Sequence, residues 1–90
     1  MQKKQKIFFY TTFGCHLCEQ VEAMILSLNN EKKISDHYDI VAVDIIDDEK
    51  KLQEYRTTIP VLENEFTGKK LFWPFDYDDL NVWLDSDHSY

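Results

Sequence analysis

Residues 11–28 read TTFGCHLCEQVEAMILSL and contain both cysteines of the chain, Cys15 and Cys18, with two residues between them. Gly14 directly precedes the pair, and apolar residues then recur at positions 17, 21, 24, 25 and 28. This spacing is typical of the buried face of an amphipathic helix. The stretch therefore predicts a helix over residues 15–28, ended by the two asparagines that follow it.

Two strongly apolar stretches flank this helix. Residues 7–12 (IFFYTT) and 39–46 (DIVAVDII) are rich in β-branched and aromatic residues at consecutive positions. Such runs are typical of strands that are buried on both faces. A strand, a helix and a strand of these lengths form a βαβ unit, in which the two strands run parallel and the crossover is right-handed.

Turn and capping residues divide the second half of the chain. Asp47 or Asp48 caps a short helix that runs to Arg56, with Leu52 and Tyr55 turned inward. Residues beyond this helix form an antiparallel hairpin, with strands at 61–66 and 69–73 and a tight turn at Thr67-Gly68.

Pro74 ends the hairpin, and Asp76 offers an N-cap for a last helix to about Ser86, with Leu80, Trp83 and Leu84 on its inner face. The order β-α-β-α-β-β-α predicts an α/β (α+β sandwich) fold with a mixed four-stranded sheet flanked by helices. We expect a single domain over residues 1–90, with flexible ends at 1–5 and 86–90.

The composition limits both the size and the partners of the protein. Ninety residues make one small domain, and the net charge of −7 disfavours nucleic acid and anionic membranes as partners. The basic residues 1–6 lead into an apolar run too short for a signal peptide, and no segment is long enough to cross a bilayer. We therefore expect a cytoplasmic protein, where the reducing environment disfavours a structural disulfide.

The two cysteines have the spacing of a redox pair. At the start of a helix, free backbone N–H groups and the positive end of the helix dipole favour the Cys15 thiolate, the nucleophilic form. Residues i and i+3 lie about 5–6 Å apart on one helix face, within the range that a disulfide requires. Cys15 can then attack a substrate disulfide, and Cys18, one turn deeper, can resolve the mixed disulfide.

Neighbouring charges act on this thiolate in both directions. A protonated His16 would add positive charge beside Cys15 and lower the pKa of its thiol, while the plain alternative is an exposed neutral side chain. Glu19 and Glu22 disfavour a nearby thiolate. Gly14 keeps side-chain bulk away from the approach to Cys15.

Three other interpretations of the cysteines stay open. Both can be packed small hydrophobes. Two thiolates supply half of a tetrahedral metal site, so the second interpretation is a metal or iron–sulfur binding module with the cysteines shared across a dimer. The third is a non-catalytic interaction protein in which the thiols have no function.

From Lys6 to Leu84 the chain resembles the glutaredoxin branch of the thioredoxin superfamily, and most of all its small bacterial glutaredoxin-like proteins. The matching stretches are residues 10–18 (YTTFGCHLC), 58–61 (TIPV) and 78–80 (DDL). The resemblance implies a thioredoxin fold and thiol–disulfide exchange as the activity.

The resemblance also implies how a substrate is held. It implies a cis Ile59–Pro60 bond beside the reactive cysteine, although the residues alone favour trans. The Ile59 backbone N–H and C=O would then face outward, and a substrate could pair with them like an added strand. Asp78 would accept the amino group of glutathione, whereas its simpler role is to complement the helix dipole.

The chain departs from glutathione-dependent glutaredoxins at two positions. These proteins usually carry a basic residue three before the first cysteine, where this chain has Thr12. They usually have Gly-Gly-x-Asp-Asp before the last helix, where residues 75–79 read FDYDD. The missing glycines put bulk where the backbone of the tripeptide would lie.

The leading hypothesis is a monomeric thiol–disulfide oxidoreductase that reduces protein or glutathione mixed disulfides. No metal or organic cofactor takes part, and glutathione or a disulfide reductase serves as the reductant. The catalytic pair is then Cys15 and Cys18, and the substrate-binding residues are Gly14, His16, Ile59, Pro60 and Asp78.

Overall fold

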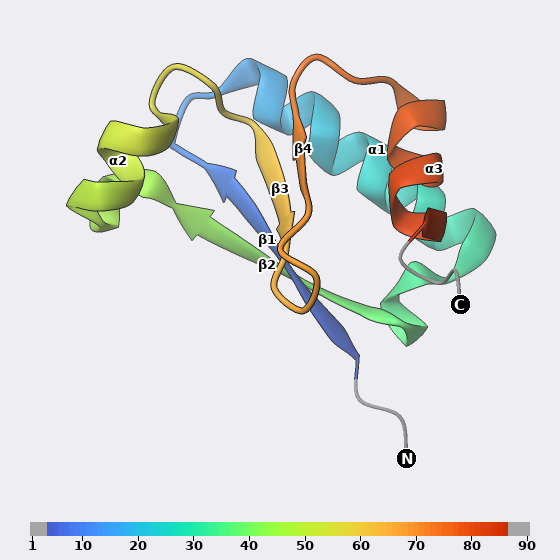
Figure 1. Cartoon of the computed structure of the whole chain (residues 1–90). Helices are drawn as coiled ribbons and strands as arrows, with labels where there is room; N and C mark the ends of the chain where they lie inside the picture. Colours follow the sequence, from blue (N-terminus) through green and yellow to red (C-terminus); the bar gives the residue numbers. More distant parts are fainter. Residues whose placement is uncertain (1–3, 87–90) are drawn as a thin grey trace.

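A computed structural model describes residues 4–86, so the flexibility predicted for 1–3 and 87–90 lies outside the described residues. Gln5 and Ser86, also placed in the predicted flexible ends, belong to the first strand and the last helix. Figure 1 shows the elements in this order along the chain: β1 (Gln5–Thr11), α1 (His16–Lys32), the 3-10 helix η1 (Ile34–Asp36), β2 (Tyr38–Asp44), the 3-10 helix η2 (Ile45–Asp47), α2 (Glu49–Tyr55), β3 (Val61–Asn64), β4 (Lys70–Phe72) and α3 (Tyr77–Ser86).

The sheet has the predicted mixed topology, with strand order β2-β1-β3-β4. β1 pairs in parallel with β2 and antiparallel with β3, and β3 pairs antiparallel with β4. In Figure 1, α1 and α3 lie on one side of the sheet and α2 on the other. The predicted β-α-β-α-β-β-α fold is confirmed.

Alternate residues of β1 serve two separate cores, because successive side chains of a strand point to opposite faces. Ile7 and Phe9 belong to the core beneath α1 and α3. Tyr10 belongs to the core beneath α2, and Phe8 packs against it. The prediction that β1 is buried on both faces is therefore confirmed.

The same prediction for β2 was wrong. Asp39 and Ala42 are exposed, and most of the strand is only half-buried. β2 is an edge strand, bonded to β1 alone within the sheet. It also ends at Asp44 rather than at position 46, because the Asp44 carboxylate accepts a hydrogen bond from the Ile46 N–H (3.1 Å) and turns the chain into η2.

The helix α1 begins where predicted but continues past the two asparagines, which was not predicted. Its last residue is Lys32. The next residue, Lys33, still donates its N–H to the Asn29 carbonyl (2.8 Å), but its positive φ of 53° turns the chain out of the helix. The Asn29 side chain accepts a hydrogen bond from Ser35 N–H (2.9 Å), so it orders the chain after the helix instead of stopping the helix.

The hairpin is present with shorter strands than predicted. β3 ends at Asn64 because this buried side chain accepts hydrogen bonds from the N–H groups of Phe66 (2.8 Å) and Thr67 (3.1 Å). Gly68 has a φ of 77° and donates its N–H to the Asn64 carbonyl, which closes the turn.

The predicted helix caps are confirmed. Asp48 accepts hydrogen bonds from the N–H groups of Lys50 and Lys51 at the start of α2. Asp76 and Asp79 form a reciprocal pair at the start of α3, in which each carboxylate accepts the other's backbone N–H. No helix among residues 4–86 has the length and apolar content needed to span a bilayer.

Beneath α2, two tyrosines stack and one of them binds a carboxylate. The rings of Tyr10 and Tyr55 are 4.6 Å apart, with Lys51 Nζ over both. The Tyr10 hydroxyl donates to Glu63 Oε1 (2.7 Å). Burial and this carboxylate raise the pKa of Tyr10 well above its usual 10.0. The contact ties β1 to β3 directly before the chain enters the cysteine loop.

We expect Tyr10→Phe to lower the free energy of unfolding by about 1–2 kcal/mol, because it leaves the Glu63 carboxylate without its donor. Tyr77→Phe is the matched control, since its hydroxyl donates to Glu31 at an exposed position, and the loss there should be smaller. Urea denaturation measures both.

The same tyrosine predicts a pH dependence. Above pH ~10 the unfolded chain releases the Tyr10 proton while the folded chain retains it, so stability should fall as pH rises. Tyr10→Phe should flatten that decline. A wild-type unfolding free energy that does not fall above pH ~10 would contradict the raised pKa.

Candidate active site

Three loops leave the sheet at the same end of its strands. Tyr10 pairs with Val61, and Val61 pairs with Phe72, so these residues form one row across β1, β3 and β4. The segments that follow β1, precede β3 and follow β4 therefore start from neighbouring positions. They lie along the upper edge in Figure 1 and carry the cysteines, Pro60 and Pro74.

Cys15 is the N-cap of α1, which is where the sequence places it. Its extended backbone (φ −83°, ψ 103°) stands just outside the helix, and its sulfur accepts a hydrogen bond from the Cys18 N–H at 3.1 Å. Its own N–H donates to the Thr12 carbonyl (3.3 Å). A sulfur in this position faces the unpaired amides of the first turn, which favours its ionised form.

The two cysteines form a disulfide, with their Cα atoms 5.2 Å apart. The predicted ability of the pair to close within one helical turn is confirmed. Cys18 is 3% exposed and lies in the core beneath α1 and α3, whereas Cys15 is only half-buried. Of the two sulfurs, Cys15 is therefore the one that a substrate can reach.

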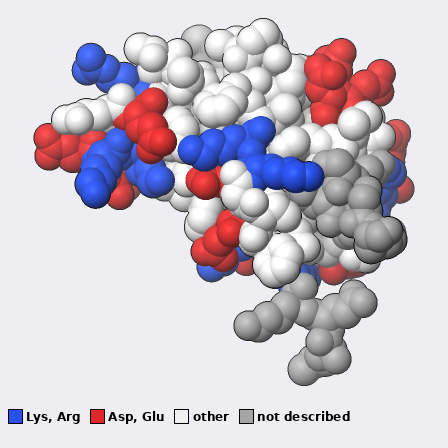
Figure 2. All heavy atoms as spheres, viewed as in Figure 1, with Lys and Arg blue, Asp and Glu red and all other residues white. Residues whose placement is uncertain are grey.

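The charges around Cys15 are few and mostly negative. His16 is exposed and turns toward Glu19, with Nδ1 3.9 Å from Oε2. Glu22 is also exposed, one turn further along α1. Figure 2 shows uncharged surface along most of the upper edge, with acidic atoms over the start of α3. The dipole and amides of α1 are thus the main positive field at the sulfur.

The Ile59–Pro60 bond is cis, as the resemblance implies and the residues alone do not. Pro60 is buried, and its carbonyl accepts the Trp73 N–H (3.3 Å). A second cis bond, Trp73–Pro74, lies on the neighbouring loop and was not predicted. The two proline loops are therefore joined directly.

The prediction that the Ile59 N–H faces outward was wrong. This N–H donates to the Tyr55 carbonyl at 3.0 Å, beside a parallel bond from the Thr58 N–H at 2.9 Å. The last turn of α2 leaves carbonyls without helical partners, and the loop that follows satisfies this one. An added strand at this edge would lack the Ile59 donor.

Gly14 acts through its backbone. Its φ is 80°, a conformation that side chains rarely adopt, and an added Cβ would meet nothing within 4 Å. Its predicted role of keeping bulk away from Cys15 stays a prediction. Its positive φ places Gly14 in the turn that leads from β1 to the start of α1.

Asp78 lies on the first turn of α3, as predicted, and is exposed. Tyr77 donates to Glu31, and Lys32 donates to Asn81 (2.7 Å), so α3 packs beside the C-terminal part of α1. Because 17 residues of helix span about 25 Å, this is the end of α1 remote from Cys15. A role for Asp78 in substrate binding stays a prediction.

Sequence reasoning missed Phe13, which is 99% exposed two residues before Cys15. Its position in the turn before Gly14 was visible, but its outward direction depends on the loop. Among residues 4–86, no three or more His, Cys, Asp or Glu side chains gather into a metal-binding cluster. A metal site on the cysteines would need ligands from elsewhere.

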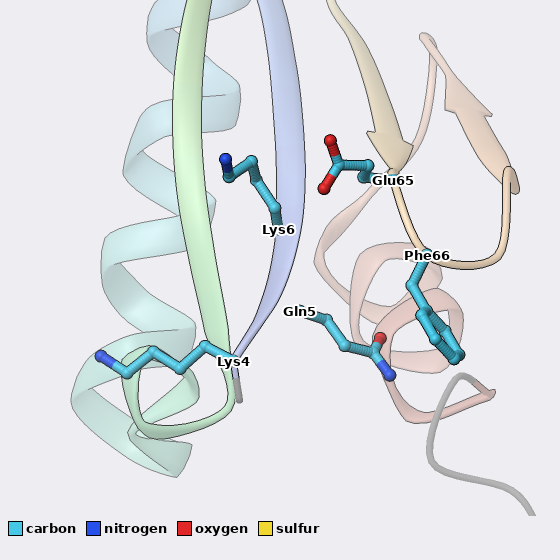
Figure 3. Close-up of a pocket in the computed structure, with 5 residues that line it drawn as sticks. All are labelled: Lys4, Gln5, Lys6, Glu65 and Phe66. Atoms are coloured by element: carbon cyan, nitrogen blue, oxygen red, sulfur yellow. The ribbon is translucent and has the colours of Figure 1, made fainter. Parts of the chain in front are cut away.

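A pocket lies at the opposite edge of the sheet, between the start of β1 and the turn after β3 (Figure 3). None of its lining residues belongs to the three loops around the cysteines, so it takes no part in the site described above. Its lining residues are Lys4, Gln5, Lys6, Glu65 and Phe66.

Comparisons with known proteins agree with this geometry. The family described as Glutaredoxin-like domain (DUF836) matches residues 6–85. The crystal structure of Northeast Structural Genomics target protein XcR50 from X. campestris is 31% identical, covering 89% of this chain and 96% of that one, with a TM-score of 0.72. Protein Ne2328 from Nitrosomonas europaea is 24% identical, covering 92% of this chain and 94% of its own, with a TM-score of 0.70.

More distant structures share the fold alone. The germline-specific thioredoxin Deadhead from Drosophila melanogaster is 17% identical, covering 92% of this chain and 80% of its own, with a TM-score of 0.67. Among curated proteins, none matches the chain. The fold is thioredoxin-like, as predicted.

In the reduced protein, we expect Cys15 to react with iodoacetamide with an apparent pKa well below the ~8.5 of a free thiol. The reason is the amide contact to its sulfur. The rates are measured against pH in Cys18→Ser, with Cys15→Ser as the matched variant that keeps only the buried thiol. Equal, slow alkylation of both variants would contradict the assignment.

The two glycines with positive φ offer a second, paired test. Gly14→Ala and Gly68→Ala should each cost about 1 kcal/mol of stability, because alanine is strained at the positive φ of these positions although neither new Cβ meets a neighbour. Only Gly14→Ala should also slow the alkylation of Cys15, because relief of that strain shifts the cysteine loop. Equal alkylation rates in the two variants would show that the turn does not set the thiolate.

Proposed function

The chain belongs to the glutaredoxin-like domain family (DUF836), and from that premise we propose that it is a dithiol–disulfide oxidoreductase. The observation that carries the proposal is the position of Cys15. Cys15 is half-buried, its sulfur accepts the Cys18 N–H at the start of α1, and Cys18 lies within disulfide-bonding distance.

The first step is attack on a substrate disulfide. The Cys15 thiolate forms a bond to one substrate sulfur, the substrate S–S bond breaks, and the other sulfur leaves as a thiolate that takes up a proton. The Cys18 N–H holds the attacking sulfur before the reaction. The product of this step is a mixed disulfide between Cys15 and the substrate.

The second step is resolution by Cys18. Its thiol loses a proton, its sulfur bonds to Cys15 Sγ, and the substrate leaves as a thiolate that takes up a proton. Ile7 and Phe9, which β1 turns toward this core, are apolar, so that strand supplies no carboxylate to receive the Cys18 proton. The departing thiolate is then the acceptor. Two electrons have passed from the dithiol to the substrate.

The substrate and the reductant belong to the same proposal. Protein disulfides or glutathione mixed disulfides are the substrates, and glutathione or a disulfide reductase returns two electrons to the oxidised pair. The protein works as a monomer in the cytoplasm and needs no resident cofactor. Pro60, buried beside the Trp73 loop, positions the substrate, with Ile59 and His16 at its sides.

A coupled assay tests the function. Reduction of bis(2-hydroxyethyl) disulfide is followed through NADPH, in parallel with glutathione plus glutathione reductase and with thioredoxin reductase. We expect turnover in at least one system and a loss of at least about 100-fold in Cys15→Ser, because the nucleophile is gone.

Cys18→Ser is the matched variant, since both substitutions abolish the disulfide. It should still attack and accumulate the mixed disulfide on Cys15, which intact-mass measurement detects. Wild-type protein without activity in either system, or a fully active Cys15→Ser, would reject the proposed function.

A further inference from the structure

An apolar rim flanks the reactive cysteine. Phe13, two residues before Cys15, is 99% exposed, and Leu17, two residues after it, is 39% exposed. Other large apolar side chains are exposed as well, Phe66 at 79% and Phe72 at 48%, but Phe13 has the highest exposed fraction of them. Phe13 and Leu17 also lie within two residues of Cys15, which a substrate sulfur must approach.

The charge beside this rim is negative. Glu19 and Glu22 are exposed on the first two turns of α1, and no Lys or Arg occurs between residues 7 and 31. The nearest cation on the neighbouring loop is Arg56, at the end of α2. A ligand with basic side chains therefore meets favourable charge over α1, and an acidic one meets repulsion.

The backbone at the site offers a substrate fewer hydrogen-bond donors than an open strand edge would. The Ile59 N–H is already donated to the Tyr55 carbonyl, so a substrate segment cannot use that donor. Affinity for a bound segment must then come more from side-chain contacts. The rim of Phe13 and Leu17 is an apolar surface beside Cys15 that can supply such contacts.

We propose that Phe13, Leu17, Glu19 and Glu22 form a docking surface for a protein segment that carries apolar and basic residues next to a disulfide-bonded cysteine. This inference rests on the proposed function and names its substrate class. Glutathione fits less well, because it has two carboxylates and no apolar side chain. In the reaction, the peptide sulfur bonds to Cys15 and the other sulfur of the disulfide leaves as a protonated thiol.

The test uses synthetic probes in which 2-mercaptoethanol is joined by a disulfide to the cysteine of a blocked pentapeptide. The three peptides are Lys-Leu-Cys-Leu-Lys, Glu-Leu-Cys-Leu-Glu and Lys-Ser-Cys-Ser-Lys. The mixed disulfide of glutathione with 2-mercaptoethanol is the fourth probe, and bis(2-hydroxyethyl) disulfide gives the baseline. Each rate with the reduced protein is divided by the rate at which dithiothreitol reduces the same probe, which removes intrinsic reactivity.

We expect the probe with both leucine and lysine to react about tenfold faster than each of the other three probes at low salt. The preference for lysine over glutamate should shrink at high salt, because the carboxylates of α1 are exposed.

Matched variants test which residues cause the preferences for leucine and for lysine. Phe13→Ser should remove most of the preference for leucine over serine, while Phe66→Ser, an exposed phenylalanine at the opposite edge, should keep it. Glu22→Gln should reduce the preference for lysine over glutamate, while Asp36→Asn, an exposed carboxylate on η1, should not.

Three results would overturn the inference. Equal normalised rates for all probes, or a fastest reaction with the glutathione probe, would reject the docking surface while leaving the oxidoreductase function intact. No reaction even with bis(2-hydroxyethyl) disulfide would reject the function itself, and the docking surface with it.

Discussion

The site depends on one hydrogen bond, from the Cys18 N–H to the Cys15 sulfur. It exists because α1 begins one residue after Cys15, so that this sulfur occupies the capping position where serine or aspartate more often stands. A cap of this kind satisfies an amide that the helix leaves unpaired. In the reduced protein such a contact favours a thiolate, so the start of the helix and the activation of Cys15 in the proposed reaction share one cause.

β1 places that cap at the correct edge of the sheet. Its alternating side chains hold α1 and α3 on one face through Ile7 and Phe9, and α2 on the other through Phe8 and Tyr10. Because β1 lies between β2 and β3 and is bonded to both, its end is held laterally as well. The cysteine loop therefore starts from a strand that is held on both sides, next to the two proline loops.

Near Cys15, the structure agrees with the family resemblance at one point and departs from it at another. The cis Ile59–Pro60 bond lies in the loop that the resemblance indicates, but the Ile59 N–H is already used by Tyr55. The start of α3 is held beside the remote end of α1 by Tyr77 and Glu31. The Ile59 N–H is thus not available to an added strand, while Phe13, two residues before Cys15, is 99% exposed.

Local patterns in the sequence determined the elements and the cysteine pair. Helical spacing after Cys15, the caps Asp48 and Asp76 and the turn at Gly68 act between near neighbours, so they could be predicted. The edge position of β2, the direction of Phe13 and the partner of the Ile59 N–H depend on segments distant in the chain. Only the tertiary structure decided these three features. The reason is that burial and hydrogen-bond pairing depend on which distant segments pack against a residue, and the spacing of residue types in one sequence does not show this.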